Sequence, residues 1–196
     1  MKKVLLLIDL QNDYFEGGSN PLVGSLDAVL KTQKLLQYFR LNSLPVIHIQ
    51  HISIRKDATF FLPETVGAEI HQCVSPEEYE SIVIKHYPNS FYQTNLNQLL
   101  LSQGITDLVV CGMMTHMCVD ATVRAAKDLG YNCTIMQDAC ATKSLEFNGF
   151  MIEAWQIQAS FLAALIPFYA TIVSVDEYIN SCLVAFESGT PSACNI

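Results

Sequence analysis

Short apolar runs alternate along this chain with longer segments in which apolar residues recur every three or four positions. The short runs are typical of strands buried on both faces, and the longer spacing is typical of helices that pack along one side. The short runs predict strands at residues 4–8, 45–49, 82–84, 108–111, 133–136 and 170–173. The longer segments predict helices at residues 26–41, 94–103, 117–129, 148–165 and 176–182.

The regular alternation of strands and helices predicts an α/β fold with three layers, α/β/α, around a six-stranded, mostly parallel, Rossmann-like sheet. No linker, internal repeat or low-complexity tract interrupts the pattern, so we expect a single domain over residues 1–186. Residues 187–196, which are rich in Gly, Ser and Thr, are expected to form a loose tail. Residues 53–80 are long for a connection and are expected to carry short helices and part of a site wall.

Composition excludes several classes of partner. The formal net charge of −8 and the pI near 5.0 argue against general nucleic-acid binding, which would need a basic face. An anionic small molecule stays open, because a local site can be positive inside an acidic protein. No apolar stretch approaches the roughly 18 residues that span a bilayer, so no membrane partner is expected.

Cysteine usage and the N-terminal residues point to the cytoplasm. Seven cysteines are an odd number without a C-x-x-C pair, which fits neither a disulfide framework nor a zinc site. The apolar run after Lys3 ends at Asp9, so it is too short for the core of a secretory signal peptide. We therefore expect a cytoplasmic protein.

Three reactive side chains follow strands of the predicted sheet. Asp9 ends the first strand, Lys85 ends the third, and Cys118 follows the fourth where a helix begins. In open α/β sheets ligands bind beyond the carboxyl ends of the strands. Taken singly, the aspartate could cap a loop, the lysine could reach solvent and the cysteine could be a small buried apolar residue. Together at one edge of a sheet they favour a site.

These residue types form a consistent chemical set. A thiol at a helix start faces the positive end of the helix dipole, which is expected to lower the pKa of Cys118. Asp9 could accept the thiol proton and return it to a leaving group, while the cation of Lys85 holds the carboxylate. Backbone N–H groups in the turn before Cys118 could hold an oxyanion, each worth about 3 kcal/mol.

Three segments of the sequence resemble the isochorismatase-like cysteine hydrolases. They are residues 8–15 (IDLQNDYF), 83–91 (VIKHYPNSF) and 111–126 (CGMMTHMCVDATVRAA), and the similarity runs from residue 4 to about 177. This family includes nicotinamidases, N-carbamoylsarcosine amidohydrolases and streptothricin hydrolases.

The resemblance implies a role for each matching position. Asp9, Lys85 and Cys118 match the catalytic triad of the family. The family also has a cis non-proline peptide bond, which here would join Met113 to Met114. The oxyanion would be bound by the backbone N–H groups of Met114 and Cys118. Family members commonly form dimers or tetramers, so the resemblance also implies a homo-oligomer that acts on a small-molecule substrate.

Several neighbouring side chains are candidates for the substrate pocket. These candidates are Gln11, Phe15, His51, Phe91, His116 and Met117. Phe15 and Phe91 could equally pack in the core, since aromatic side chains near strand ends are commonly buried. Gln11 could satisfy the loop backbone, and His51 is favoured as a hydrogen-bonded residue at a strand end.

The sequence departs from the nicotinamidases at their metal site, which uses an Asp-x-His pair after the second strand. Here that stretch reads His48-Ile49-Gln50-His51, without the aspartate. Residues three apart on a strand point to opposite faces, so the two histidines cannot both bind one ion. His71 remains, but histidines without a carboxylate make a poor site. We expect no metal and no cofactor.

The sequence therefore predicts a cysteine-dependent hydrolase that cleaves a small amide or a related C–N bond through a thioester-type acyl-enzyme. One alternative is a vinyl-ether hydrolase of isochorismatase type, which does not need the thiol. Another is a redox or binding protein with a reactive cysteine. The sequence does not identify the substrate.

Overall fold

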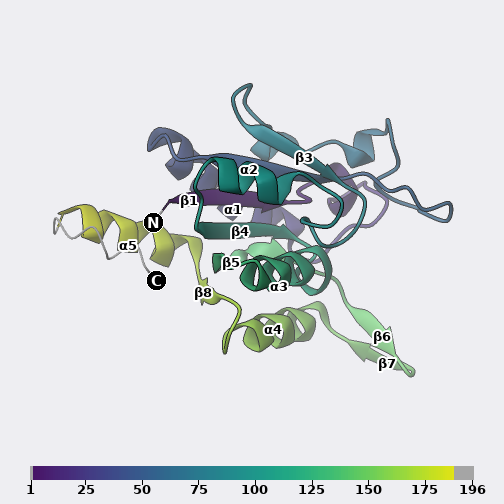
Figure 1. The fold of residues 1–196 in the computed structure, drawn as a ribbon. Coiled ribbons are helices and arrows are strands. Elements are labelled where there is room, and N and C mark those ends of the chain that lie inside the picture. Colours follow the sequence, from purple (N-terminus) through teal and green to yellow (C-terminus); the bar gives the residue numbers. More distant parts are fainter. Residues whose placement is uncertain (1, 188–196) are drawn as a thin grey trace.

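The computed structural model describes residues 2–187, which form a six-stranded parallel sheet between two layers of helices (Figure 1). The strand order is β3-β2-β1-β4-β5-β8, and every pairing is parallel. The strands are β1 (Lys3–Ile8), β2 (Val46–His51), β3 (Ser81–Lys85), β4 (Asp107–Met113), β5 (Asn132–Ala141) and β8 (Thr171–Val173). The α-helices are α1 (Ser25–Leu41), α2 (Leu96–Ser102), α3 (Asp120–Asp128), α4 (Ala154–Leu165) and α5 (Val175–Glu187).

The core explains why the first strand is a continuous apolar run. Leu5 and Leu7 of β1 belong to the apolar cluster that includes residues of α1 and α5. Val4, Leu6 and Ile8 belong to the cluster on the other face, with residues of α2, α3 and α4. Because β1 lies in the middle of the sheet, alternate side chains on both of its faces are removed from water. The predicted three-layer α/β fold is confirmed.

The prediction of a helix from residue 148 is wrong at its start. Residues 145–152 instead form a hairpin of β6 (Leu145–Phe147) and β7 (Phe150–Ile152), which projects from the body of the protein (Figure 1). Asn148 and Gly149 between the strands have φ of 51° and 80°, as in the tight turns that an Asn-Gly pair favours. The helix α4 begins only at Ala154. Glu153 at its N-cap and Gln156 in its first turn form a capping box.

The helix predicted at 117–129 is divided into two parts. A π-helical turn, η4 (Thr115–Val119), leads directly into α3. Within the long connection between β2 and β3, the expected short helices are present as η2 (Val66–Ala68) and η3 (Gln72–Val74).

Other expectations are resolved only in part. No α-helix among residues 2–187 is long and apolar enough to cross a membrane.

Cys182 in α5 is disulfide-bonded, which the cysteine pattern did not predict. The single-domain boundary at residue 186 stays a prediction, and most of the tail predicted at 187–196 lies outside the described residues.

Candidate functional site

The sheet brings the three reactive side chains together beyond the carboxyl ends of its strands. Lys85 Nζ lies 2.8 Å from Asp9 Oδ2, and both side chains are fully buried. Potential metal-ligand atoms of Asp9, His51 and Cys118 all lie within 4.8 Å of one another. The side chains of Asp9, Lys85 and Cys118 therefore lie close together. This agrees with the prediction made from their positions at or after the ends of β1, β3 and β4.

A close approach between β1 and β4 shapes the backbone at this edge. Gly112 has φ of 137°, and a Cβ added there would lie only 2.1 Å from the carbonyl oxygen of Ile8. Glycine is thus required where the two strands pass beside Asp9. Asp9 itself has φ of 51°, and its backbone N–H donates to Ile49 O of the neighbouring strand. The peptide bond after Met113 is cis, as the family resemblance implied.

Lys85 is a buried cation with several acceptors around it. Its ammonium donates to the carbonyl oxygens of Tyr87 and Pro88, at 3.2 and 3.0 Å, in addition to its ion pair with Asp9. Burial alone lowers the pKa of Lys85, but the charge of Asp9 and its hydrogen bond outweigh it, so the pKa is raised above its ordinary value. Lys85 therefore stays charged at physiological pH and fixes the position of the carboxylate.

Asp9 has unused capacity to accept a proton. Although its carboxylate faces Lys85, neither carboxylate oxygen receives a hydrogen bond of good geometry within the described residues. Buried acceptors in native proteins normally have donors, and exceptions are often functional. A carboxylate in this state, beside a thiol, is suited to take up the proton of that thiol.

The thiol of Cys118 differs from the sequence expectation. Its burial, followed by the Asp9 carboxylate, raises its pKa above the ordinary value, although Lys85 acts in the opposite direction. The prediction of a lowered pKa was wrong because it considered only the local helix start and not the buried setting of the side chain. At rest the sulfur is therefore a neutral thiol, and it becomes a thiolate only when a base removes its proton.

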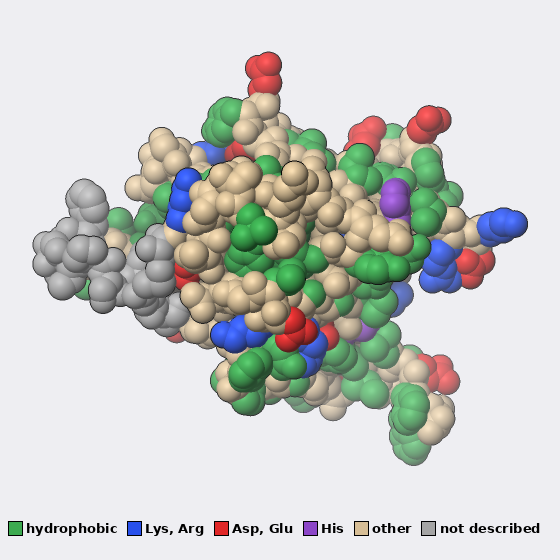
Figure 2. Space-filling model, viewed as in Figure 1, with side chains coloured by type: hydrophobic (Ala, Val, Ile, Leu, Met, Phe, Trp, Pro, Cys, Tyr) green, Lys and Arg blue, Asp and Glu red, His purple; other side chains and the backbone are tan. Residues whose placement is uncertain are grey.

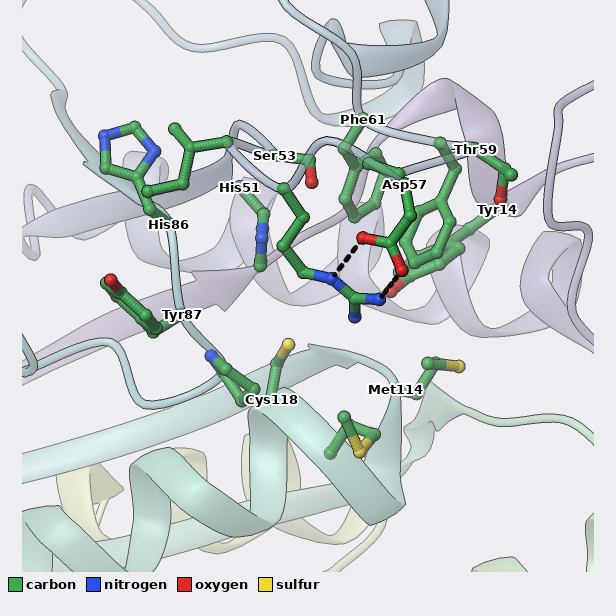
Figure 3. Close-up of a pocket in the computed structure, with 16 residues that line it drawn as sticks. Tyr14, His51, Ser53, Asp57, Thr59, Phe61, His86, Tyr87, Met114 and Cys118 are labelled. Carbon is green, nitrogen blue, oxygen red and sulfur yellow. Dashed lines mark hydrogen bonds and ion pairs between the residues drawn. The ribbon is translucent and has the colours of Figure 1, made fainter.

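A cavity of about 420 Å³ opens onto the sulfur of Cys118 (Figure 3). Most of its wall is apolar and aromatic. The aromatic part consists of Tyr14, Phe60, Phe61 and Tyr87. Four predicted site residues contribute to the lining: His51, Met114, Met117 and Cys118. The cavity thus offers an enclosed, largely apolar space beside the reactive group, as small-molecule sites commonly do.

Gln11 does not line this cavity but holds its wall in place. Its Nε2 donates to the carbonyl oxygens of His51 and Ala68, and its Oε1 accepts from the backbone N–H of His51. The side chain is fully buried, with all of these bonds directed to backbone groups. It therefore positions His51, which agrees with the loop-satisfying alternative and not with the pocket role.

The three other predicted pocket residues also lie outside the cavity lining. Phe15 stacks on His71 with ring centroids 4.0 Å apart, and Phe91 stacks on Tyr131 at 5.9 Å. The Nδ1 atom of His116 forms a hydrogen bond with a threonine hydroxyl just after β5. Each of the three rings contacts another element in place of this cavity, so their assignment to the pocket stays a prediction.

Sequence reasoning missed several residues that form the wall. Tyr14 enters the cavity instead of its neighbour Phe15, because the short turn η1 (Asn12–Tyr14) directs it inward. Residues 53–61 supply one side, which confirms the expectation that the long connection forms part of a wall. The sequence carried no signal to show which members of that segment face inward.

The histidines near β2 do not form a shared metal site. His51 Nδ1 lies 3.9 Å from Asp9 Oδ2, and burial lowers the pKa of His51 to about 4, so this ring is neutral at physiological pH. His48 points to the opposite face, where its Nε2 lies 2.9 Å from Glu80 Oε2. His71 is occupied in stacking on Phe15.

The donor set beside the sulfur is a poor fit for a resident metal ion. Asp9, His51 and Cys118 could offer three ligand atoms. However, the ammonium of Lys85 already lies 2.8 Å from the Asp9 carboxylate and would repel a cation placed there. These residues therefore suit proton transfer better than metal binding.

Comparisons with known proteins agree with this fold. Residues 3–165 match the family model described as the isochorismatase domain. The chain is 45% identical over 179 residues to the isochorismatase family protein YddQ of Bacillus subtilis, covering 91% of this chain and 99% of that protein. It is 34% identical over 140 residues to a streptothricin hydrolase of Streptomyces noursei, covering 71% of this chain and 50% of that enzyme.

A solved structure of a putative isochorismatase hydrolase from Oleispira antarctica superposes with a TM-score of 0.88. The two chains are 49% identical, and the match covers 91% of this chain and 96% of the other. The match therefore extends over nearly the whole of both folds. On the family model and these relatives together, the chain belongs to the isochorismatase family of hydrolases.

Proposed function

We propose that this chain is a cysteine-dependent hydrolase of a small amide or a related C–N bond. The observation that carries the proposal is the buried ion pair of Lys85 and Asp9, at 2.8 Å, beside a thiol that opens into an apolar cavity. Asp9, Lys85 and Cys118 would be the catalytic residues. The name of the streptothricin hydrolase relative is consistent with a hydrolytic reaction.

The first half of the reaction forms an acyl-enzyme. Asp9 removes the proton of the neutral Cys118 thiol as the sulfur attacks the carbonyl carbon of the substrate. A C–S bond forms, and the electron pair of the C=O bond moves to the oxygen. The backbone N–H groups of Met114 and Cys118, both in the cavity lining, would bind this oxyanion.

The second half releases the products. When the tetrahedral intermediate collapses, the C–N bond breaks and protonated Asp9 gives its proton to the departing nitrogen. Water then attacks the thioester while Asp9 accepts one of its protons, and the C–S bond breaks to restore the thiol. Lys85 keeps its charge throughout and holds the carboxylate in position.

The alternative of a vinyl-ether hydrolase draws on the family to which the chain belongs. Such a reaction needs a proton donor but no nucleophilic sulfur. The placement of Cys118 against Asp9, with the sulfur facing the cavity, favours the acyl transfer route. A vinyl-ether assay with the thiol blocked separates the two, since only the alternative reaction would survive.

A redox or binding role for Cys118 is less well supported by its surroundings. The sulfur is buried, and Cys111, Cys133 and Cys140 are buried in the core. Conformational change after peroxide treatment, with no hydrolysis of any amide, would favour the redox role over the proposed one.

The proposal extends to assembly and compartment. The hairpin and the start of α4 expose large apolar side chains, with Phe147 67%, Phe150 75% and Trp155 70% accessible. We propose that this arm joins copies of the chain into a homo-oligomer, because isolated hairpins are seldom stable alone. Light scattering would show a smaller particle for Phe150→Ser if this is right. For the compartment we propose the cytoplasm, which the free thiol of Cys118 favours and the disulfide of Cys182 does not.

The direct test compares Cys118→Ala and Cys118→Ser with the unchanged protein on a panel of small primary amides that includes nicotinamide. Ammonia release should fall at least about 10³-fold in both variants. Their thermal unfolding should stay close to that of the parent protein. Turnover that persists in Cys118→Ala would exclude the covalent mechanism.

A further inference from the structure

We propose that Arg55 binds a carboxylate on the substrate, so that the amide hydrolysed here carries an anionic group at its far end. The inference rests on the proposed function and adds the substrate class. Its basis is the position of one guanidinium group on the wall of the cavity that contains the Cys118 sulfur.

Charge on the cavity wall is concentrated in one place. Among the described residues that line the cavity, Arg55 is the one lysine or arginine, and Asp57 is the one carboxylate. His51, also in the lining, is neutral because its pKa is lowered to about 4 by burial. Lys85 is not part of the lining and is committed to Asp9. A substrate that enters this space therefore meets a single permanent cation near the mouth.

The guanidinium already holds a carboxylate in the geometry that a substrate would use. Arg55 Nε donates to Asp57 Oδ1 at 3.2 Å, and Nη2 donates to Oδ2 at 2.7 Å. Figure 3 shows the Asp57 carboxylate, with dashed lines for both bonds, over the space between Phe61 and Met114. Such a fork is the preferred arginine–carboxylate arrangement.

The Asp57 carboxylate is easily exchanged for another. Both side chains are exposed, 73% for Arg55 and 75% for Asp57, and exposed ion pairs contribute little to stability. A substrate carboxylate can thus replace Asp57 without loss of hydrogen bonds by the guanidinium. Asp57 then acts as a competitor that keeps the fork ordered when the cavity is empty.

The loop that carries Arg55 is fixed at both ends. Ser53 N–H donates to Phe61 O at 2.8 Å, which closes the loop on itself. Phe61 N–H donates to the buried carboxylate of Asp13 at 2.6 Å, which ties the loop to the segment after β1. Inside the loop, Ala58 N–H donates to Arg55 O. The guanidinium is therefore presented from an anchored segment, as positioning of a substrate requires.

The remainder of the cavity suits an apolar body between the two polar ends. Aromatic rings of Tyr14, Phe61 and Tyr87 line the cavity, and Figure 3 shows Tyr87 on the side opposite Tyr14 and Phe61. A substrate with its scissile amide at Cys118, a short apolar or planar middle and a terminal carboxylate matches these surfaces.

The experiment uses two reagents of equal length that alkylate thiols. N-(iodoacetyl)-β-alanine carries a carboxylate, and N-propyl-iodoacetamide replaces it with a methyl group. Rates of labelling at Cys118 are measured by peptide mass spectrometry at pH 8 and are normalised to rates with glutathione. The one-carbon-longer pair, from γ-aminobutyrate and butylamine, is run beside it.

We expect the carboxylate reagent to react about tenfold faster than its neutral partner, with a ratio near one in Arg55→Gln. In Asp57→Asn the ratio should rise, because the competing carboxylate is gone. Lys56→Gln is the matched control: it removes the same charge from an exposed neighbour that does not line the cavity, and it should keep the parent ratio.

Two results would overturn the inference while leaving the proposed function intact. The first is a ratio that Arg55→Gln leaves unchanged with both spacers. The second is an equal fall of the rate ratio in Lys56→Gln, which would indicate general electrostatic attraction and not a specific binding group. If neither reagent labels Cys118 in the folded protein, the nucleophile itself fails, and the proposed function fails with it.

Discussion

Replacing Lys85 by methionine tests the buried ion pair at the centre of the site. The change keeps a long apolar side chain but removes the ammonium that lies 2.8 Å from Asp9 Oδ2. Asp9 has no well-formed hydrogen bond to compensate for the loss. Breaking a buried pair by removing one partner typically destabilises by about 3–5 kcal/mol, because the other charge is left without a partner.

We therefore expect Lys85→Met to lower the free energy of unfolding by about 3–5 kcal/mol at pH 8. Urea unfolding followed by circular dichroism measures this difference.

The double variant Asp9→Asn with Lys85→Met provides the control. It removes both charges, so it should be more stable at pH 8 than Lys85→Met alone. A Lys85→Met variant that unfolds at the same urea concentration as the parent would contradict a stabilising ion pair, as would a double variant no more stable than Lys85→Met.

Three further variants test other parts of the account. Asp9→Asn should lower kcat about 10²–10⁴-fold in an ammonia-release assay, because Cys118 loses its base; an unchanged kcat would remove that role. Glu80→Gln should destabilise by about 2 kcal/mol in urea unfolding. Arg40 donates to the Glu80 carboxylate from Nε and Nη2, at 2.8 and 2.7 Å. Although burial opposes it, this contact holds the pKa of Glu80 at about 2, so the parent's extra stability exists above pH 4.5 and is lost as the pH falls toward 2. The variant should lack that acid dependence, and equal acid curves would contradict the assignment. Gly112→Ala should destabilise by about 3 kcal/mol or more in thermal unfolding, and an unaffected Tm would show that the strands can separate.

The sequence was sufficient to predict the fold and the proximity of Asp9, Lys85 and Cys118. Both follow from local patterns: apolar runs mark buried strands, and parallel strands bring their carboxyl ends to one edge of the sheet. Asp9 and Lys85 each come at such an end, so their meeting depends only on strand order. The hairpin at residues 145–152 was missed, although its Asn148-Gly149 turn is a recognised local signal.

The walls of the cavity and the state of the thiol could not be predicted in the same way. Residues 53–55 and 57–61 line the cavity, and Asp13, some fifty positions earlier, holds this segment through the backbone of Phe61. No local periodicity encodes a contact of that range. The raised pKa of Cys118 likewise follows from burial beneath elements distant in sequence, whereas the helix-dipole argument used only neighbouring residues.

The proposed mechanism requires a covalent bond between substrate and Cys118. It is measured by acid quenching during turnover of an amide that the protein hydrolyses, followed by mass spectrometry of the peptide that contains Cys118. We expect an added acyl mass on this peptide that disappears when the substrate is exhausted. Ammonia release at full rate with no acyl mass on Cys118 at any time would contradict it.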